Sequence, residues 1–118
     1  LGNLGDAYRA LGQYQQAIEF HQQSLLIKRE LGDRAGTAVS LNKLGKACCG
    51  LGEYERAIDF YQSSLEMARE ISDRSGEAHS LAGLSKIYYC LGEYQRANAY
   101  HHKSLSLVKE LGECLVLQ

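Results

Sequence analysis

The chain has 118 residues and a formal net charge of −1, with 13 Lys and Arg against 14 Asp and Glu. Its length fits one domain, and its hydrophobic content of 45% is typical of a globular protein and not of a disordered one. The balanced charge argues against a nucleic-acid partner, and no apolar run approaches the roughly 18 residues that span a membrane.

Proline is absent and glycine occurs 12 times, a combination that favours helices separated by glycine turns. The chain begins without a Met at Leu1, in the middle of a repeating pattern, so we expect it to be a piece of a longer protein. The four cysteines form no C-x-x-C pair and match no zinc spacing, and the adjacent Cys48 and Cys49 are poorly placed for a mutual disulfide. We therefore expect reduced thiols in a cytoplasmic protein.

The sequence repeats itself at a shift of 40 residues without a gap, and half of the positions in the first two copies are identical. This self-similarity predicts a single repeat array over 1–118, because a fixed period is the signature of stacked units. The predicted units are 1–31, 34–71 and 74–111, the first of them with a truncated opening helix. Residues 112–118 begin the next unit or form a capping tail.

Each unit is predicted to hold two helices. In the first unit a shortened helix over 1–10 precedes a second helix over 13–30. The first helix of the middle unit has apolar or small residues at steps of three and four: Thr37, Leu41, Leu44, Cys48 and Leu51. After a break at 50–52, the second helix of that unit runs to about Ile71. Its apolar face consists of Tyr54, Ala57, Ile58, Tyr61, Leu65 and Ala68.

Short connections separate these helices and force neighbours to be antiparallel. Gly32 is placed to cap the end of one helix, and Asp33 and Asp73 are placed to cap the start of the next. The small side chains of Gly45 and Ala57 allow the two helices of a unit to approach closely. Because one pair cannot bury both of its faces, the units are expected to stack into a solenoid.

The pattern resembles the tetratricopeptide repeat (TPR). In the middle copy the matching residues are Leu41, Leu44, Gly45, Cys48, Ala57, Tyr61, Ser64 and Leu65. Arg29 and Arg69 stand where the family often has Pro, Ser85 replaces a Gly, and the period of 40 exceeds the usual 34. This longer form, with its link over 32–36, is similar to the Pins/LGN adaptor repeats, equally to bacterial and notably cyanobacterial arrays, and more distantly to the kinesin light chain.

The resemblance implies an all-α, right-handed solenoid of antiparallel helix pairs, which serves as an intracellular scaffold or adaptor for protein partners without a cofactor. Catalysis is not expected, because the polar residues fall into repeat positions. His21 and His101 occupy the position of Tyr61, which predicts a packed or edge-exposed core histidine and not a catalytic one. The adjacent His101 and His102 point in different directions on a helix, so a shared metal is not expected. For His79 the sequence does not decide between a position that faces the groove and an ordinary surface position. Cys49 has no evident activating group, so a nucleophile is not expected there.

The resemblance also implies that the first helices line a concave groove. The peptide-binding residues expected there are Arg34, Asn42, Lys46, Cys49, Arg74, His79, Lys86 and Tyr89. In the truncated first unit the corresponding positions are Gly2, Asp6 and Arg9. Bases outnumber acids in the first-helix segments, whereas acids outnumber bases in the second-helix segments. The groove is therefore predicted to attract an extended acidic peptide.

Two alternatives stay open, because Lys and Arg on helices are usually solvated surface. The first alternative is a structural spacer, and the second is a regulatory repeat segment of a larger multidomain protein. The ends of the array also carry apolar faces suited to neighbouring units, and these faces predict self-association. They consist of Leu1, Leu4 and Tyr8 at one end and of Tyr100, Leu105 and Val108 at the other.

Overall fold

The computed structural model describes residues 13–117, and the side chains up to Gly112. Its five α-helices are α2 (Tyr14–Glu30), α3 (Arg34–Leu51), α4 (Tyr54–Glu70), α5 (Arg74–Cys90) and α6 (Tyr94–Leu117). No strand occurs within this range. The expectations for the first helix of the opening unit, including Gly2, Asp6 and Arg9, lie outside the described residues, as do those for Leu1, Leu4 and Tyr8.

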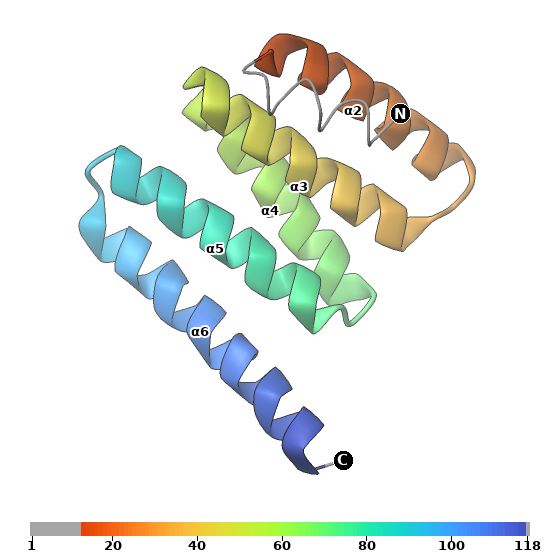
Figure 1. Ribbon diagram of the computed structural model, residues 1–118. Helices are drawn as coiled ribbons and strands as arrows, with labels where there is room; N and C mark the ends of the chain where they lie inside the picture. Colours follow the sequence, from red (N-terminus) through yellow and green to blue (C-terminus); the bar gives the residue numbers. More distant parts are fainter. Residues whose placement is uncertain (1–12, 118) are drawn as a thin grey trace.

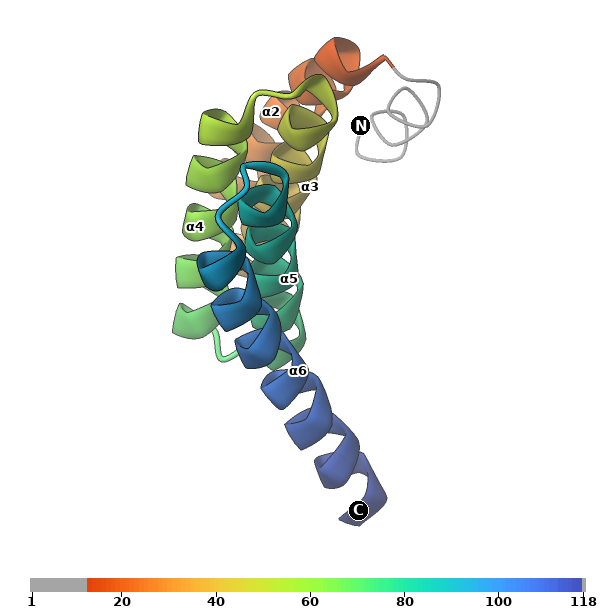
Figure 2. The same ribbon diagram turned by 90° about the vertical axis from the view of Figure 1, so that its left-hand side faces the viewer.

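Consecutive helices pack against one another as antiparallel neighbours, from α2 to α6 (Figure 1). In addition, α3 contacts α5 directly, although α4 lies between them in the sequence. Figure 2 shows the result as two layers, with α4 on one side and α3 and α5 on the other. The predicted all-α stack of helical hairpins is therefore confirmed.

The predicted helix caps are present at the connections between helices. The Asp33 carboxylate accepts a hydrogen bond from the Gly36 backbone N–H at 2.8 Å, and the Asp73 carboxylate accepts one from the Gly76 N–H at 3.0 Å. These bonds satisfy N–H groups that have no partner in the first turn of a helix. Gly32 follows the end of α2 with a φ of 69°, the left-handed conformation that only glycine adopts without strain.

The last helix differs from the others in length. It has 24 residues, against 17 or 18 in the other four, and its C-terminal part extends beyond them (Figures 1 and 2). Residues 112–117, for which the sequence leaves a new unit or a capping tail open, continue α6 without a break. Gly112 is not among the glycines with positive φ, so α6 has no left-handed cap at this repeat position.

The core lies between the two helix layers and consists mainly of repeated Ala, Leu and Tyr positions. Gly45 and Ala57 are both buried, as the small-residue pattern predicts. The ring of Tyr61 fills the space over Gly45, because a Cβ built there would lie 2.9 Å from the ring. Tyr61 is 4% exposed, and its ring packs from α4 against both Gly45 of α3 and Gly83 of α5.

Buried serines connect the layers at equivalent positions. The Ser64 hydroxyl donates to the Ala38 carbonyl at 2.9 Å, and the Ser104 hydroxyl donates to the Ala78 carbonyl at 3.0 Å. The Ser80 hydroxyl also donates to the Ser64 oxygen at 3.1 Å. Burying a hydroxyl group without a hydrogen bond destabilises a fold. These hydrogen bonds offset that cost, so serine is tolerated at these core positions.

The two histidines at the Tyr61 position have different surroundings. His21 on α2 is 1% exposed, which confirms the predicted packing role. His101 on α6 is exposed, because no helix in the described chain covers that side of α6. The same repeat position is thus core or surface according to whether a next unit is present.

Candidate peptide-binding groove

A groove with a volume of about 600 Å³ crosses the stack. Its walls come mainly from α3 and α5, with two residues each from α4 and α6 and with Tyr14 from α2. Residues from all five described helices therefore line one continuous hollow. A ligand that fills it contacts more than one repeat.

Five of the eight residues expected in the groove line this hollow together. They are Asn42, Lys46, Cys49, His79 and Lys86. A smaller hollow of about 300 Å³ shares Asn42, Lys46 and His79 with it and continues along the N-terminal half of α5. The first helices of two repeats thus contribute to one surface.

The charges around the larger hollow have one sign. Lys46 and Lys86 are both exposed on its rim, and among residues 13–117 no Asp or Glu lines it. The smaller hollow adds Lys43 and one carboxylate, Asp73, which caps α5. A cleft with low-dielectric walls and only positive charges along its lining raises the local concentration of anionic ligands.

His79 has a defined tautomer. Its Nδ1 lies 2.8 Å from the Ser75 carbonyl oxygen, and a carbonyl only accepts, so Nδ1 carries the hydrogen. The Nε2 atom is then the ring nitrogen left for other partners. This places a polar imidazole edge on the surface that both hollows share.

The cysteines differ in burial. Cys48 is fully buried, and burial raises the pKa of its thiol. Burial also raises the pKa of the Cys49 thiol, while the ammonium of Lys86 acts in the opposite direction. Cys90 is exposed and lies beside Tyr54, whose hydroxyl pKa it raises by its negative charge when ionised. Neither buried thiol has the lowered pKa of a nucleophile.

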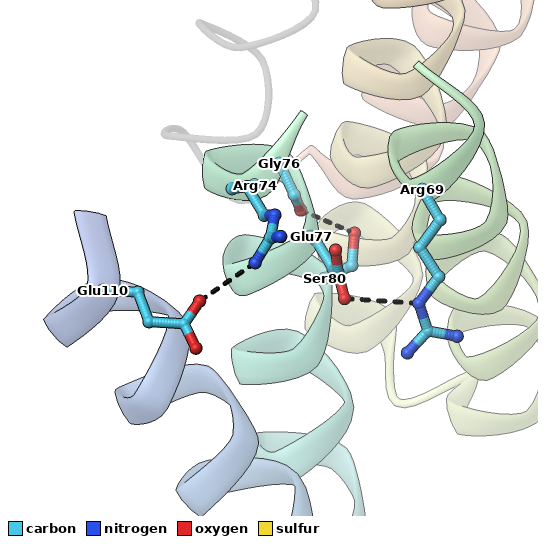
Figure 3. Close-up of polar contacts among 6 residues, drawn as sticks. All are labelled: Arg69, Arg74, Gly76, Glu77, Ser80 and Glu110. Atoms are coloured by element: carbon cyan, nitrogen blue, oxygen red, sulfur yellow. Dashed lines mark hydrogen bonds and ion pairs between the residues drawn. The ribbon is translucent and has the colours of Figure 1, made fainter. Parts of the chain in front are cut away.

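The remaining three expected residues, Arg34, Arg74 and Tyr89, do not line either hollow. An Arg74 guanidinium nitrogen lies 2.9 Å from a Glu110 carboxylate oxygen, and Figure 3 shows the two side chains pointing toward each other across α5 and α6. The Tyr89 ring packs edge-on against Tyr94, with centroids 5.2 Å apart. Contacts within the chain hold these two side chains away from the groove.

A comparison of the chain with models of known protein families identifies its family. The model of the tetratricopeptide repeat family matches residues 1–70 and 49–110. The chain belongs to the TPR family. TPR repeats generally mediate protein–protein interactions, and TPR domains are typically non-enzymatic scaffolds.

The solved structures agree on the TPR fold. The crystal structure of the TPR domain of Arabidopsis FLU superposes with a TM-score of 0.85 at 18% sequence identity, over 92% of this chain and 91% of that one. This similarity shows a shared solenoid and nothing more specific. No curated protein matches the chain significantly.

The aromatic part of the TPR groove was not predicted from the sequence. Tyr14, Tyr54 and Tyr61 on second helices line the hollow, although their repeat positions indicated packing. The rings of Tyr14 and Tyr61 reach it because the first helices have glycines there. A Cβ at Gly50 would overlap the Tyr14 ring, and one at Gly83 would lie 2.5 Å from the Tyr61 ring. The glycines inside the first helices are the sequence feature that could have indicated these aromatic contacts.

Other chemistry is limited within the part of the TPR array that the structure describes. That part holds no group of three or more His, Cys, Asp or Glu arranged to bind a metal ion. It also holds no helix that is both long and apolar enough to cross a membrane.

Proposed function

We propose that this TPR array is a protein-interaction module whose groove binds an extended acidic peptide segment. The observation that carries the proposal is the composition of the larger hollow, which has Lys46, Lys86 and His79 on its walls and no carboxylate among the lining residues in the part of the chain that the structure describes. Complementary charge gives such a groove its preference among peptides.

Several contacts must act together in this site. Lys46 and Lys86 are exposed, and an exposed ion pair contributes up to about 1 kcal/mol. The partly exposed rings of Tyr14 and Tyr54 add apolar area that a peptide can bury, and the Asn42 amide adds a donor and an acceptor. The affinity therefore depends on a segment long enough to reach several of these groups.

An extended segment fits the shape of the groove. The hollow follows α3 from Asn42 to Gly50 and α5 from Ala78 to Cys90, and it has an open side. A segment that lies in it can reach both Lys46 and Lys86. Arg34, Arg74 and Tyr89 lie outside the hollow and are not part of the proposed contact surface.

The test is a peptide-array or pull-down experiment that compares acidic with neutral extended peptides. Charge reversal by Lys46→Glu with Lys86→Glu is expected to abolish the preference for acidic peptides, whereas Lys109→Glu, on α6 outside both hollows, is a matched control expected to keep it. A chain that acts only as a spacer or regulatory segment would show no acidic preference at all. That result would overturn the proposal.

A further inference from the structure

We propose that the ring of His79 takes up a proton when the groove binds an acidic segment, so that binding strengthens as the pH falls through the neutral range. This inference rests on the proposed function and adds to it the residue that makes the groove sensitive to pH. It follows from a hydrogen bond that the ring already makes within its own helix.

The first observation is that one side of the imidazole is occupied. Its Nδ1 atom lies 2.8 Å from the backbone carbonyl oxygen of Ser75, one turn earlier in α5. A carbonyl oxygen only accepts, so Nδ1 must carry a hydrogen for this contact to be favourable. A neutral imidazole has a single hydrogen on its two nitrogens, so Nε2 is then left with a lone pair.

The second observation is the place of the ring on the surface. His79 is exposed and lines both the larger and the smaller hollow, as Lys46 does. An acidic segment in either hollow brings carboxylate oxygens, which also only accept, to the surface that contains the ring. Two acceptors on opposite sides of the ring need two donors, and only the protonated imidazole has both.

The neutral ring cannot satisfy both acceptors. With its hydrogen on Nε2 it could donate to a carboxylate, but the lone pair of Nδ1 would then face the Ser75 oxygen at 2.8 Å. The Ser75 carbonyl is part of the backbone of α5, so the ring would have to rotate away from it. The contact with Ser75 therefore makes the affinity for an anion depend on a proton at Nε2.

The charged groups that surround the ring do not supply this anion. The charged residues that line the two hollows with it are Lys43, Lys46, Lys86 and Asp73. Three of the four are positive, and the Asp73 carboxylate already accepts from the Gly76 N–H. Among the described residues, α4 and α6 contribute no charged side chain to either lining, and Glu110 of α6 is paired with Arg74 outside both hollows. The negative charge that stabilises an imidazolium therefore comes with the ligand.

The remaining titratable groups in these linings are phenols and thiols. They belong to Tyr14, Tyr54, Tyr61, Cys49 and Cys90. Phenol and thiol groups ordinarily lose their proton at a higher pH than imidazole does. The residue equivalent to His79 in the preceding repeat is Val39, which lines the smaller hollow and cannot titrate. Within the described linings, His79 is thus the side chain that changes charge near neutral pH.

The experiment measures binding of the 118-residue chain to a synthetic acidic peptide by isothermal titration calorimetry at low salt, between pH 6 and pH 8. The peptide alternates Asp with Ser and Gly, and both of its ends are blocked, so that none of its groups titrates in this range. A neutral counterpart carries Asn in place of Asp. The acidic peptide is expected to bind up to about fivefold more tightly at pH 6 than at pH 8, which corresponds to one exposed ion pair.

Proton uptake is measured directly by repeating the titration at pH 7 in buffers that differ in their enthalpy of ionisation. The dependence of the binding enthalpy on the buffer is expected to show net uptake of less than one proton per peptide. His79→Gln, which cannot titrate, should lose both this uptake and the dependence of affinity on pH. His102→Gln changes an exposed histidine of α6 outside both hollows, and this matched control should keep both.

A third variant separates the charge of the ring from its shape. His79→Lys carries a permanent positive charge and is expected to bind the acidic peptide as tightly at pH 8 as at pH 6. Circular dichroism melting checks that all three variants, altered at exposed residues, keep the fold.

The outcomes distinguish the two claims. If the acidic peptide binds better than the neutral one but equally well at pH 6 and pH 8, the inference is wrong while the acidic groove stands. The same holds if the dependence on pH survives in His79→Gln. If the acidic peptide binds no better than the neutral one, the proposed function fails and the inference fails with it. Tighter binding at pH 6 that is lost in His79→Gln and kept in His102→Gln supports both.

Discussion

The ring of Tyr61 on α4 occupies the space that a side chain on Gly83 of α5 would need. A Cβ built at Gly83 would lie 2.5 Å from two ring carbons of Tyr61, closer than real Cβ contacts come. The ring is 4% exposed and also covers Gly45 on α3, so it has little room to withdraw. This one aromatic side chain joins two repeats and forms part of the groove floor.

Gly83→Ala is expected to destabilise the fold by about 1–3 kcal/mol, because the added methyl group overpacks the contact with Tyr61. The measurement is the urea midpoint of unfolding. Gly112→Ala is the matched control, since nothing lies within 4 Å of its Cβ position and its place in α6 favours alanine. A Gly83→Ala variant as stable as the parent would contradict this prediction, because it would mean that α5 can move away from the Tyr61 ring at no cost.

Ser72→Gly is expected to stabilise the fold by up to about 1 kcal/mol. Ser72 connects α4 to α5 with a φ of 57°, the left-handed region where a side chain is strained, and the equivalent Gly32 has a φ of 69°. The reciprocal variant Gly32→Ala should lower the free energy of unfolding for the same reason. Thermal unfolding of both variants measures the two changes in stability, which should have opposite signs. Shifts of Tm in the same direction would contradict the role of backbone conformation at these two positions.

Asp73→Ala is expected to cost about 0.5–2 kcal/mol of stability, because the Gly76 N–H loses its acceptor at the start of α5. Asp73→Asn keeps an oxygen in the same place and should cost much less. Denaturant unfolding of the two variants measures the difference. Equal losses would mean that the negative charge, and not the hydrogen bond, stabilises this turn.

The cysteines are expected to react with iodoacetamide in the order Cys90, Cys49, Cys48. Cys90 is exposed, whereas burial raises the pKa of the other two thiols above the ordinary 9.0, so less thiolate is present at pH 8. Peptide mass spectrometry over time gives the order, and Cys48→Ala removes one signal as a control. Modification of Cys48 as fast as Cys90 would be inconsistent with its burial.

The same raised pKa has a consequence for stability at high pH. A buried thiol that stays protonated in the fold ionises more readily in the unfolded chain, so its contribution is complete below pH 9.0 and is lost as the pH rises through the folded-state value. The free energy of unfolding should therefore fall in alkaline buffer, and less so in Cys48→Ala.

Self-association is expected at high protein concentration, through the side of α6 that no described helix covers. Leu105 is 50% exposed there, next to the exposed His101, whose counterpart Tyr61 is buried by a following helix. Leu105→Lys should shift the mass seen by light scattering toward the monomer, while Glu66→Lys, at an exposed position of α4, should not. A monomeric mass for the parent chain at all concentrations would contradict this expectation.

The sequence by itself determined the helices, their turns and their order. Helical periodicity, the caps at Asp33 and Asp73, and the turn at Gly32 are local features, because each depends on residues a few positions apart. The repetition of the pattern then determined that the helices stack as TPR units. The resemblance to the TPR family implied a groove lined by the first helices, and Lys46 and Lys86 line the larger hollow.

Only the tertiary structure decided which of these residues share a surface. Arg74 is paired with Glu110 and Tyr89 packs on Tyr94, so neither lines the groove, while the rings of Tyr14, Tyr54 and Tyr61 do. Identical repeat positions differ in burial, as His21 and His101 show. The physical reason is that burial, pairing and access depend on what the neighbouring helix presents across the interface, and no pattern within one helix contains that information.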